Sequence, residues 1–243
     1  MQRFLGVCCN VLSTVLGSFK ALVKPRPERK HIWCFILINC IAMCAESFGD
    51  VLVLFYNLQY KMEIDTFGWL LSAWAIGSFF SQSFLTPFLS FKVGLSDTVI
   101  IMIGLTCNSL DVFIESLMNQ VWVLFACWGV LQMFWDCMFL MTLSAISKLV
   151  KPTEAGKFLA LVELFNKIIG AGARPAYNLI YEATLKTYPA TSLYIAIMFF
   201  QIALALTIYT HVDMKRKEKK MVKEENPEKM LSINSTQEEL NNL

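Results

Sequence analysis

Long stretches with few charges dominate this sequence and limit the folds that it can adopt. Between residues 31 and 210 the chain holds only eight Lys or Arg and eleven Asp or Glu, mostly in short connecting segments. An apolar segment of about 20 residues can cross the hydrocarbon core of a bilayer as a helix. Six such segments follow one another: 32–57, 67–90, 97–116, 121–146, 157–181 and 190–210. We therefore expect an all-α membrane protein built as a bundle of six transmembrane helices.

The two ends of the chain differ from this apolar centre. Residues 1–30 place apolar side chains at helical spacing before a basic run, which predicts a cytosolic helix in the membrane interface and a basic linker. A first membrane span is the alternative for this segment. Residues 211–243 are charged and poor in large apolar side chains, so we expect a disordered cytosolic tail. The six-helix transmembrane domain is then expected over residues 31–210.

Lys and Arg are distributed unequally between the two sets of connectors. If residues 24–30 are cytosolic, the same side holds the basic residues of two further connectors and of the tail, whereas the opposite side holds Lys61 and Lys186. Basic residues concentrate in the cytosolic loops of membrane proteins. We therefore expect an integral, multi-pass membrane protein with both termini in the cytosol.

The sequence lacks the motifs of several other function classes. It contains no Walker A loop, HExxH motif or GxSxG motif, so we expect neither an ATP-driven pump nor an enzyme. The eight cysteines form no CxxC pair, and we expect no metal site and no cofactor. A net charge of +2 gives no reason to expect nucleic acid as a partner. The expected partners are the lipid bilayer, a small organic solute and protons.

Ionisable and amide side chains recur inside four of the six expected helices. On the first, fourth and fifth helices they lie four or seven residues apart, and therefore on one face of each helix. A charge at the centre of a membrane helix costs roughly 2.5–3.5 kcal/mol on insertion scales, so these groups must be paired or hydrated. We expect them to line an inward-facing polar cavity; they are Glu46, Asp50, Gln82, Gln132, Asp136, Glu163, Lys167 and Arg174.

Two of these acids, Asp50 and Asp136, have no basic neighbour on their own helix. They can pair with Lys167 or Arg174 across the bundle, or take up a proton, because burial raises the affinity of a carboxylate for protons. We predict that Asp50 and Asp136 carry protons. Lys167 and Arg174 would attract an anionic group or pair with those acids. A pair between Glu163 and Lys167 along their own helix, serving only assembly, is the alternative for these two residues.

Other polar or helix-breaking residues have structural explanations. Asp111 and Glu115 lie close to the outer end of the third helix, where we expect their carboxylates to reach the interface. His31 and His211 lie at the expected cytosolic boundaries, and we interpret them as interfacial. Pro175 follows a run of Gly and Ala in the fifth helix, where it either kinks the helix beside the cavity or accompanies close helix packing.

Several short motifs are similar to those of one transporter family. They are ISKLV at 146–150, EAGKF at 154–158, YNLIYEAT at 177–184, Tyr188-Pro189, and LSDT at 95–98. The first four resemble the segments around the tenth and eleventh helices of solute carrier family 46, the proton-coupled folate transporter family of the major facilitator superfamily. The last resembles the connector between the eighth and ninth helices of that family. The similar region spans about residues 30–210.

The resemblance implies that the six helices correspond to helices seven to twelve of a twelve-helix carrier. In that fold helices seven, eight, ten and eleven line the cavity, which are the helices that hold the polar residues here. The implied function is secondary transport of a small organic solute by alternating access, coupled to protons. The membrane would be the plasma membrane or an endolysosomal membrane. Leu143 stands where several relatives have an arginine, so one basic contact for an anionic substrate is missing.

The resemblance also implies that the sequence corresponds to only one half of a carrier. We expect a fragment, a short isoform or a truncated gene product that lacks the amino-terminal half of the carrier. Such a chain would need that half, or a second copy of itself, to transport a solute. The alternative is a non-transporting isoform that acts in the membrane as a regulatory or assembly partner of a full-length carrier.

Overall fold

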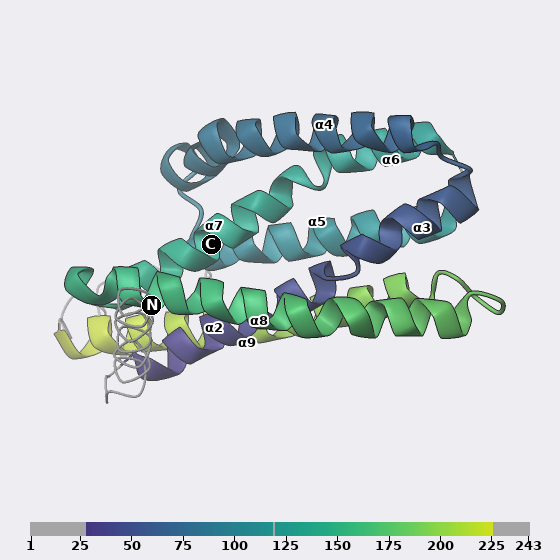
Figure 1. The fold of residues 1–243 in the computed structure, drawn as a ribbon. Helices are drawn as coiled ribbons and strands as arrows, with labels where there is room; N and C mark the ends of the chain where they lie inside the picture. The colour runs from purple at the N-terminus through teal and green to yellow at the C-terminus, as the bar shows by residue number, and fades with distance from the viewer. Residues whose placement is uncertain (1–27, 119, 226–243) are drawn as a thin grey trace, which may run out of the picture.

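The computed structural model describes residues 28–118 and 120–225, and every regular element within them is helical (Figure 1). Two pairs and one set of three neighbouring elements continue one another, so the described part of the chain forms six long helices. This confirms the predicted six-helix membrane bundle. The elements are α2 (Arg29–Glu46), α3 (Gly49–Tyr60), α4 (Ile64–Phe80), the π-helices η1 (Ser81–Leu85) and η2 (Phe88–Lys92), α5 (Asp97–Leu117), α6 (Val121–Val130), α7 (Met133–Leu149), α8 (Pro152–Thr184) and α9 (Thr191–Glu225).

Four of the long helices in the described part of the chain are apolar and long enough to cross a membrane. They are Arg29–Tyr60, Asp97–Leu117, Val121–Leu149 and Thr191–Met221. The other two are α8 and α4 with its π-helical continuation. The charges of Glu163, Lys167 and Arg174 lower the hydropathy of α8, which holds three of the expected cavity residues.

Two of the long helices are interrupted near their middle. The first breaks between the end of α2 at Glu46 and the start of α3 at Gly49, and the fourth breaks between Val130 and Met133. At the first break, Ser47 Oγ donates a hydrogen bond to the Met43 carbonyl at 2.7 Å, and such side-chain bonds compete with the helical backbone pattern. By contrast, α8 is not interrupted at Pro175.

Pro87 lies between the two π-helical segments that end the second long helix. Proline lacks a backbone N–H, and its ring clashes with the carbonyl of the preceding turn. A helix accommodates this clash by a kink or by local π-helical geometry. The sequence of this segment therefore accounts for its departure from α-helix.

The last helix is longer than a membrane crossing requires, because α9 extends over 35 residues to Glu225. Residues 211–225, which we expected to begin a disordered tail, are therefore helical. Lys, Arg, Glu and Met have high helix propensity, so a charged segment that follows a helix can prolong it. The rest of the expected tail, and the expected interfacial helix and basic linker up to residue 27, lie outside the described residues.

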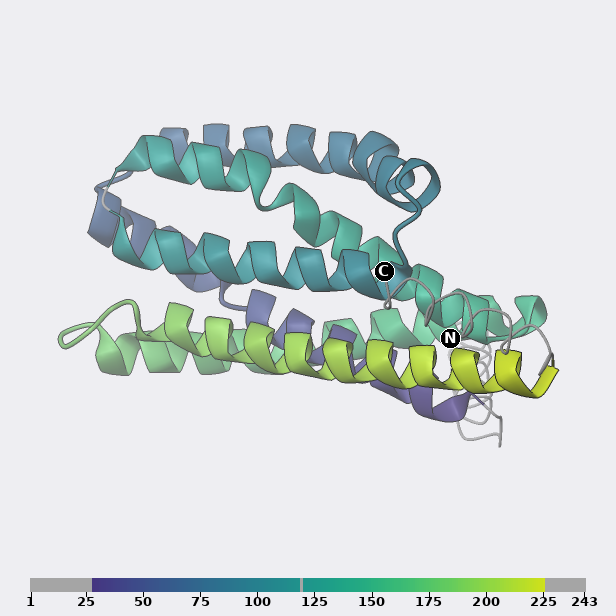
Figure 2. The same ribbon diagram turned by 180° about the vertical axis from the view of Figure 1, so that it is seen from behind.

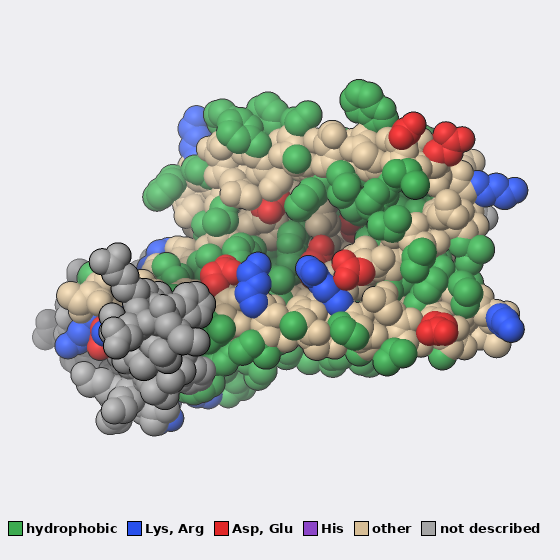
Figure 3. Space-filling view, viewed as in Figure 1, with side chains coloured by type: hydrophobic (Ala, Val, Ile, Leu, Met, Phe, Trp, Pro, Cys, Tyr) green, Lys and Arg blue, Asp and Glu red, His purple; other side chains and the backbone are tan. Residues whose placement is uncertain are grey.

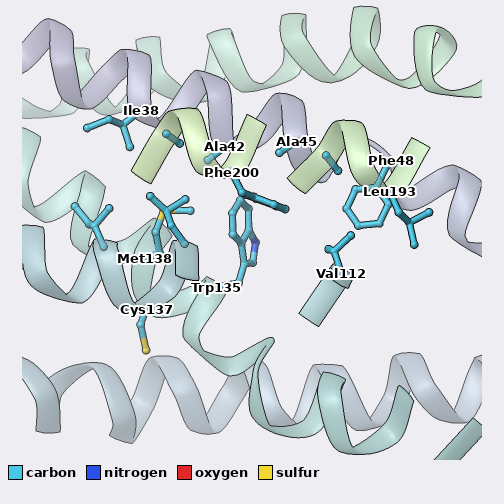
Figure 4. Close-up of a cluster of buried hydrophobic side chains, with 14 of the residues drawn as sticks. Ile38, Ala42, Ala45, Phe48, Val112, Trp135, Cys137, Met138, Leu193 and Phe200 are labelled. Atoms are coloured by element: carbon cyan, nitrogen blue, oxygen red, sulfur yellow. The ribbon is translucent and has the colours of Figure 1, made fainter. Parts of the chain in front are cut away.

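The apolar core lies where α2, α5, α7 and α9 meet (Figure 4). Ala45 of α2 and Phe200 of α9 are fully buried, and Trp135 of α7 contacts Phe200 edge-on with 6.0 Å between ring centroids. Seen from behind, α5 and α9 lie beside each other in front of the other helices (Figure 2). The expected cavity helices therefore lie on the opposite face of the bundle.

Gly104 sets the distance between α5 and α7. A Cβ atom at this position would lie 2.5 Å from Met138 Cβ and 2.6 Å from the Phe134 carbonyl oxygen. Neither atom belongs to the flexible end of a side chain, so the two helices can pack this closely only with glycine at position 104.

Candidate functional site

Five of the eight residues expected to line a cavity surround one cavity of about 550 Å³. We call it the central cavity. Glu46 of α2 and Asp136 of α7 contribute acidic groups, and α8 contributes Glu163, Lys167 and Arg174. Acidic and basic side chains lie next to one another on this face of the molecule, along α8 (Figure 3). Charged groups from three separate helices therefore converge at one place.

An ion pair links Asp50 of α3 to Arg174 of α8 across the bundle. Arg174 Nε lies 3.9 Å from Asp50 Oδ2, and the side chains are 61% and 53% exposed. Exposed ion pairs contribute about 0–1 kcal/mol to stability, so this one is not needed to hold the fold together. Asp50 faces a neighbouring cavity of about 610 Å³, which Asn57 and Tyr181 also line.

Asp136 lies beside Gln82, as expected of two cavity residues on different helices. Gln82 Nε2 is 3.1 Å from Ser78 Oγ and 3.5 Å from Asp136 Oδ1, and can donate to both. The other carboxylate oxygen of Asp136 is buried without a hydrogen-bond partner. Among the described residues, the ion pairs do not include Asp136.

Glu163 and Lys167 both line the central cavity with exposed side chains. In the part of the chain that the structure describes, neither residue takes part in an ion pair. A pair along α8 was the assembly-only alternative for these residues, and the structure does not contain it.

A second cavity of about 350 Å³ adjoins the central cavity, because Glu46 and Arg174 line both. We call it the acidic cavity. Gln132, at the break between α6 and α7, lines it and is buried. Phe48 and Gly49, at the break between α2 and α3, line it as well. Both interrupted helices thus have their breaks at this cavity, and interrupted membrane helices commonly border binding sites.

Asp111 and Glu115 line the acidic cavity and do not reach the interface, so our expectation for them was wrong. Asp111 is only 2% exposed and Glu115 only 1%. Glu115 accepts hydrogen bonds from Tyr56 OH at 2.7 Å and from Trp128 Nε1 at 2.6 Å. These donors stabilise the carboxyl group inside the bundle. The spacing of four that drew attention to the other pairs also applies to this one.

Aromatic side chains from two helices fix the position of Glu115. Tyr60 OH donates to the Glu115 backbone carbonyl at 2.7 Å. The ring of Tyr56 contacts Tyr60 edge-on at 5.6 Å and Trp128 at 6.3 Å between centroids. Such aromatic packing orders the donors of α3 and α6 around the carboxyl group of α5.

His31 is also more enclosed than an interfacial residue. It is 1% exposed and lies between two carboxylates, with Nδ1 beside Glu28 and Nε2 3.1 Å from Asp213 Oδ2. His211 Nδ1 makes a hydrogen bond with Thr98. Both histidines therefore join α9 to neighbouring helices at one end of the bundle, and neither lines the central or the acidic cavity.

Comparison with known proteins places these residues within a recognised family. A family model described as Major Facilitator Superfamily matches residues 34–237. The matched segment contains all eight residues that the sequence predicted at the cavity. No curated protein matches the chain.

Proposed function

The chain belongs to the major facilitator superfamily, whose members are membrane transporters, and on this basis we propose that it moves a small organic solute by alternating access. The observation that supports this proposal best is the central cavity. Ionisable groups of α2, α7 and α8 gather there, and Gln82 of α4 adjoins it. Charged residues inside membrane helices are costly unless they face a polar interior or each other. A hydrated binding site accounts for their presence.

We propose that the transport is coupled to protons through Asp136. Its buried oxygen has no partner, while Glu46, Glu163 and Lys167 line the same cavity. When the cavity opens toward the more acidic side, Asp136 takes up a proton and loses its charge. When the cavity opens to the other side, the proton leaves and Gln82 Nε2 can donate to the carboxylate.

Asp50 and Arg174 have a second role in this proposal. Their contact is open, so protonation of Asp50 would release the guanidinium of Arg174. This event would separate α3 from α8 at this point, which links proton uptake to a change in helix arrangement.

We also propose that a further set of helices completes the cavity, from an amino-terminal half or from a second copy. Glu163, Lys167 and Arg174 have exposed side chains, and a membrane carrier needs this face covered from lipid. The motifs at residues 146–189 support membership in solute carrier family 46. The distribution of basic residues supports cytosolic termini, and either the plasma membrane or an endolysosomal membrane fits this family.

The proposed proton coupling predicts that Asp136→Asn abolishes the pH dependence of uptake. Asparagine keeps the shape of the aspartate side chain but cannot take up or release a proton. The measurement is uptake of a labelled panel of organic anions, cations and zwitterions into vesicles that hold the chain, at acidic and neutral pH. Asp65→Asn, an exposed acid at the start of α4, is the matched control and should behave as the wild type.

Asp50→Asn is measured in the same way. Unchanged pH dependence in both Asp50→Asn and Asp136→Asn would contradict the proton role of these acids. If the folded wild-type chain takes up none of the solutes, transport by this chain alone is contradicted. Transport would then require the amino-terminal half, or the chain would act as a regulatory partner of a full-length carrier.

A further inference from the structure

More acidic than basic side chains line the acidic cavity. Glu46, Asp111 and Glu115 line it, and Arg174 is the one basic residue that does so in the described part of the chain. The guanidinium of Arg174 is mostly exposed and also lies beside Asp50. Carboxylates inside a membrane protein are costly unless a cation or a set of donors balances them. The cavity therefore favours a positively charged occupant.

Three polar atoms at this cavity are buried without hydrogen-bond partners. They are Asn108 Nδ2, Asp111 Oδ1 and Trp74 Nε1, each from a residue that lines the cavity. Asn108 is 1% exposed and Asp111 is 2% exposed. Buried polar atoms in proteins are nearly always hydrogen-bonded. An occupant that satisfies them must offer a donor to Asp111 and acceptors to Asn108 and Trp74.

Aromatic side chains form part of the remaining wall. Phe67, Trp74 and Trp128 line the cavity beside the carboxyl groups. Aromatic faces attract cations through their quadrupole and pack against apolar rings. A volume of about 350 Å³ is within the range of small-molecule sites.

We propose that the acidic cavity binds a small organic cation: a protonated amine that carries a neighbouring hydrogen-bond acceptor such as a hydroxyl group. The ammonium donates to Asp111 and faces Glu46 and Glu115. The hydroxyl oxygen accepts from Asn108 Nδ2, and the rest of the molecule packs against the aromatic wall. This inference rests on the proposed transport function and names its solute class, since the acidic cavity adjoins the central one.

Other occupants explain fewer of the observations. An anion would be repelled by the three carboxylates. Protons alone would neutralise the carboxyl groups but would leave Asn108 Nδ2 and Trp74 Nε1 without acceptors. A cation of the proposed kind balances the charge and satisfies Asp111 Oδ1 and Asn108 Nδ2 together.

Three small molecules of similar shape but different charge test whether the acidic cavity binds a cation. They are 2-amino-1-phenylethanol, the neutral 1-phenyl-1,2-ethanediol and the anion mandelate. Binding to the purified full chain in lipid nanodiscs is measured by titration calorimetry at neutral pH. We expect the amine to bind at least tenfold more tightly than the diol, and mandelate not to bind. Absence of amine binding, or equal affinity for the amine and the diol, would overturn the proposal.

Matched variants locate the site. Asp111→Asn should weaken amine binding at least tenfold, and Asn108→Leu should weaken it as well. The exposed acids give the controls Asp65→Asn and Glu63→Gln, which should bind as the wild type does. Asp111→Asn removes a buried charge without changing volume, and a thermal unfolding curve checks that each variant is folded. Unchanged amine affinity in folded Asp111→Asn would overturn the proposed site.

The binding measurement separates this inference from the proposed transport function. Amine binding that depends on Asp111, with no uptake of the amine into vesicles, would keep the site and refute transport. Uptake of other solutes without amine binding would keep transport and refute the site.

Discussion

Gly104→Ala should markedly destabilise the protein, although it adds a single methyl group. The new Cβ would lie 2.5 Å from Met138 Cβ and 2.6 Å from the Phe134 carbonyl oxygen, so α5 and α7 must move apart. Overpacking of this kind costs about 1–3 kcal/mol, and more where the backbone cannot shift. We expect a lower midpoint temperature of thermal unfolding. It is measured by tryptophan fluorescence of the protein in detergent.

Gly129→Ala is the matched control for this prediction. Gly129 is also helical, in α6, but a Cβ there meets no atom within 4 Å. Alanine favours a helix over glycine by about 1 kcal/mol, so this variant should be as stable as the wild type or more stable. Equal stability of the two variants would show that α5 and α7 are not packed as described.

Arg174→Ala should reduce uptake at least tenfold and leave the fold nearly as stable as before. Arg174 lines both the central and the acidic cavity and contacts Asp50. Loss of a hydrogen bond to a charged group costs about 1.5–3 kcal/mol. A cost of this size lowers a binding constant about tenfold or more. Its exposed ion pair contributes only about 0–1 kcal/mol to stability. Uptake is normalised to the amount of folded protein in the vesicles.

Two further variants sharpen the result. Lys186→Ala removes an exposed basic residue outside the cavities and should leave uptake unchanged. The double variant Asp50→Arg with Arg174→Asp keeps both charges in exchanged positions. If the ion pair itself matters, it should restore part of the activity that either single change removes. Normal uptake by Arg174→Ala would exclude the arginine from the transport site.

The number and order of the long helices followed from the sequence because the hydrophobic thickness of a bilayer sets the length of an apolar segment. The convergence of Glu46, Asp136 and the three charged residues of α8 was also predictable. Their helical spacing and the cost of burying charge both restrict where they can point. Five of the eight residues line the central cavity. Their roles in solute binding and proton transfer stay predictions.

The breaks at Ser47 and Leu131 were not predictable, because neither a proline nor a pair of adjacent glycines marks them. The burial of Asp111 and Glu115 was also missed. Their depth depends on Tyr56 of α3 and Trp128 of α6, which approach Glu115 from two other helices. The spacing of four places both carboxyl groups on one face of α5. The three-dimensional arrangement shows that this face points inward.

We expect the polar groups of separate helices to face one water-accessible cavity rather than lipid. Cysteine labelling in the native membrane tests it directly, in a background whose own cysteines are replaced by serine or alanine. Single cysteines are placed at Ala171 and Glu46 of the central cavity, and at the exposed apolar positions Leu110 and Ile202 of α5 and α9. We predict that a charged maleimide modifies the two cavity positions and spares the other two. Equal modification of all four, or modification of only Leu110 and Ile202, would contradict the account.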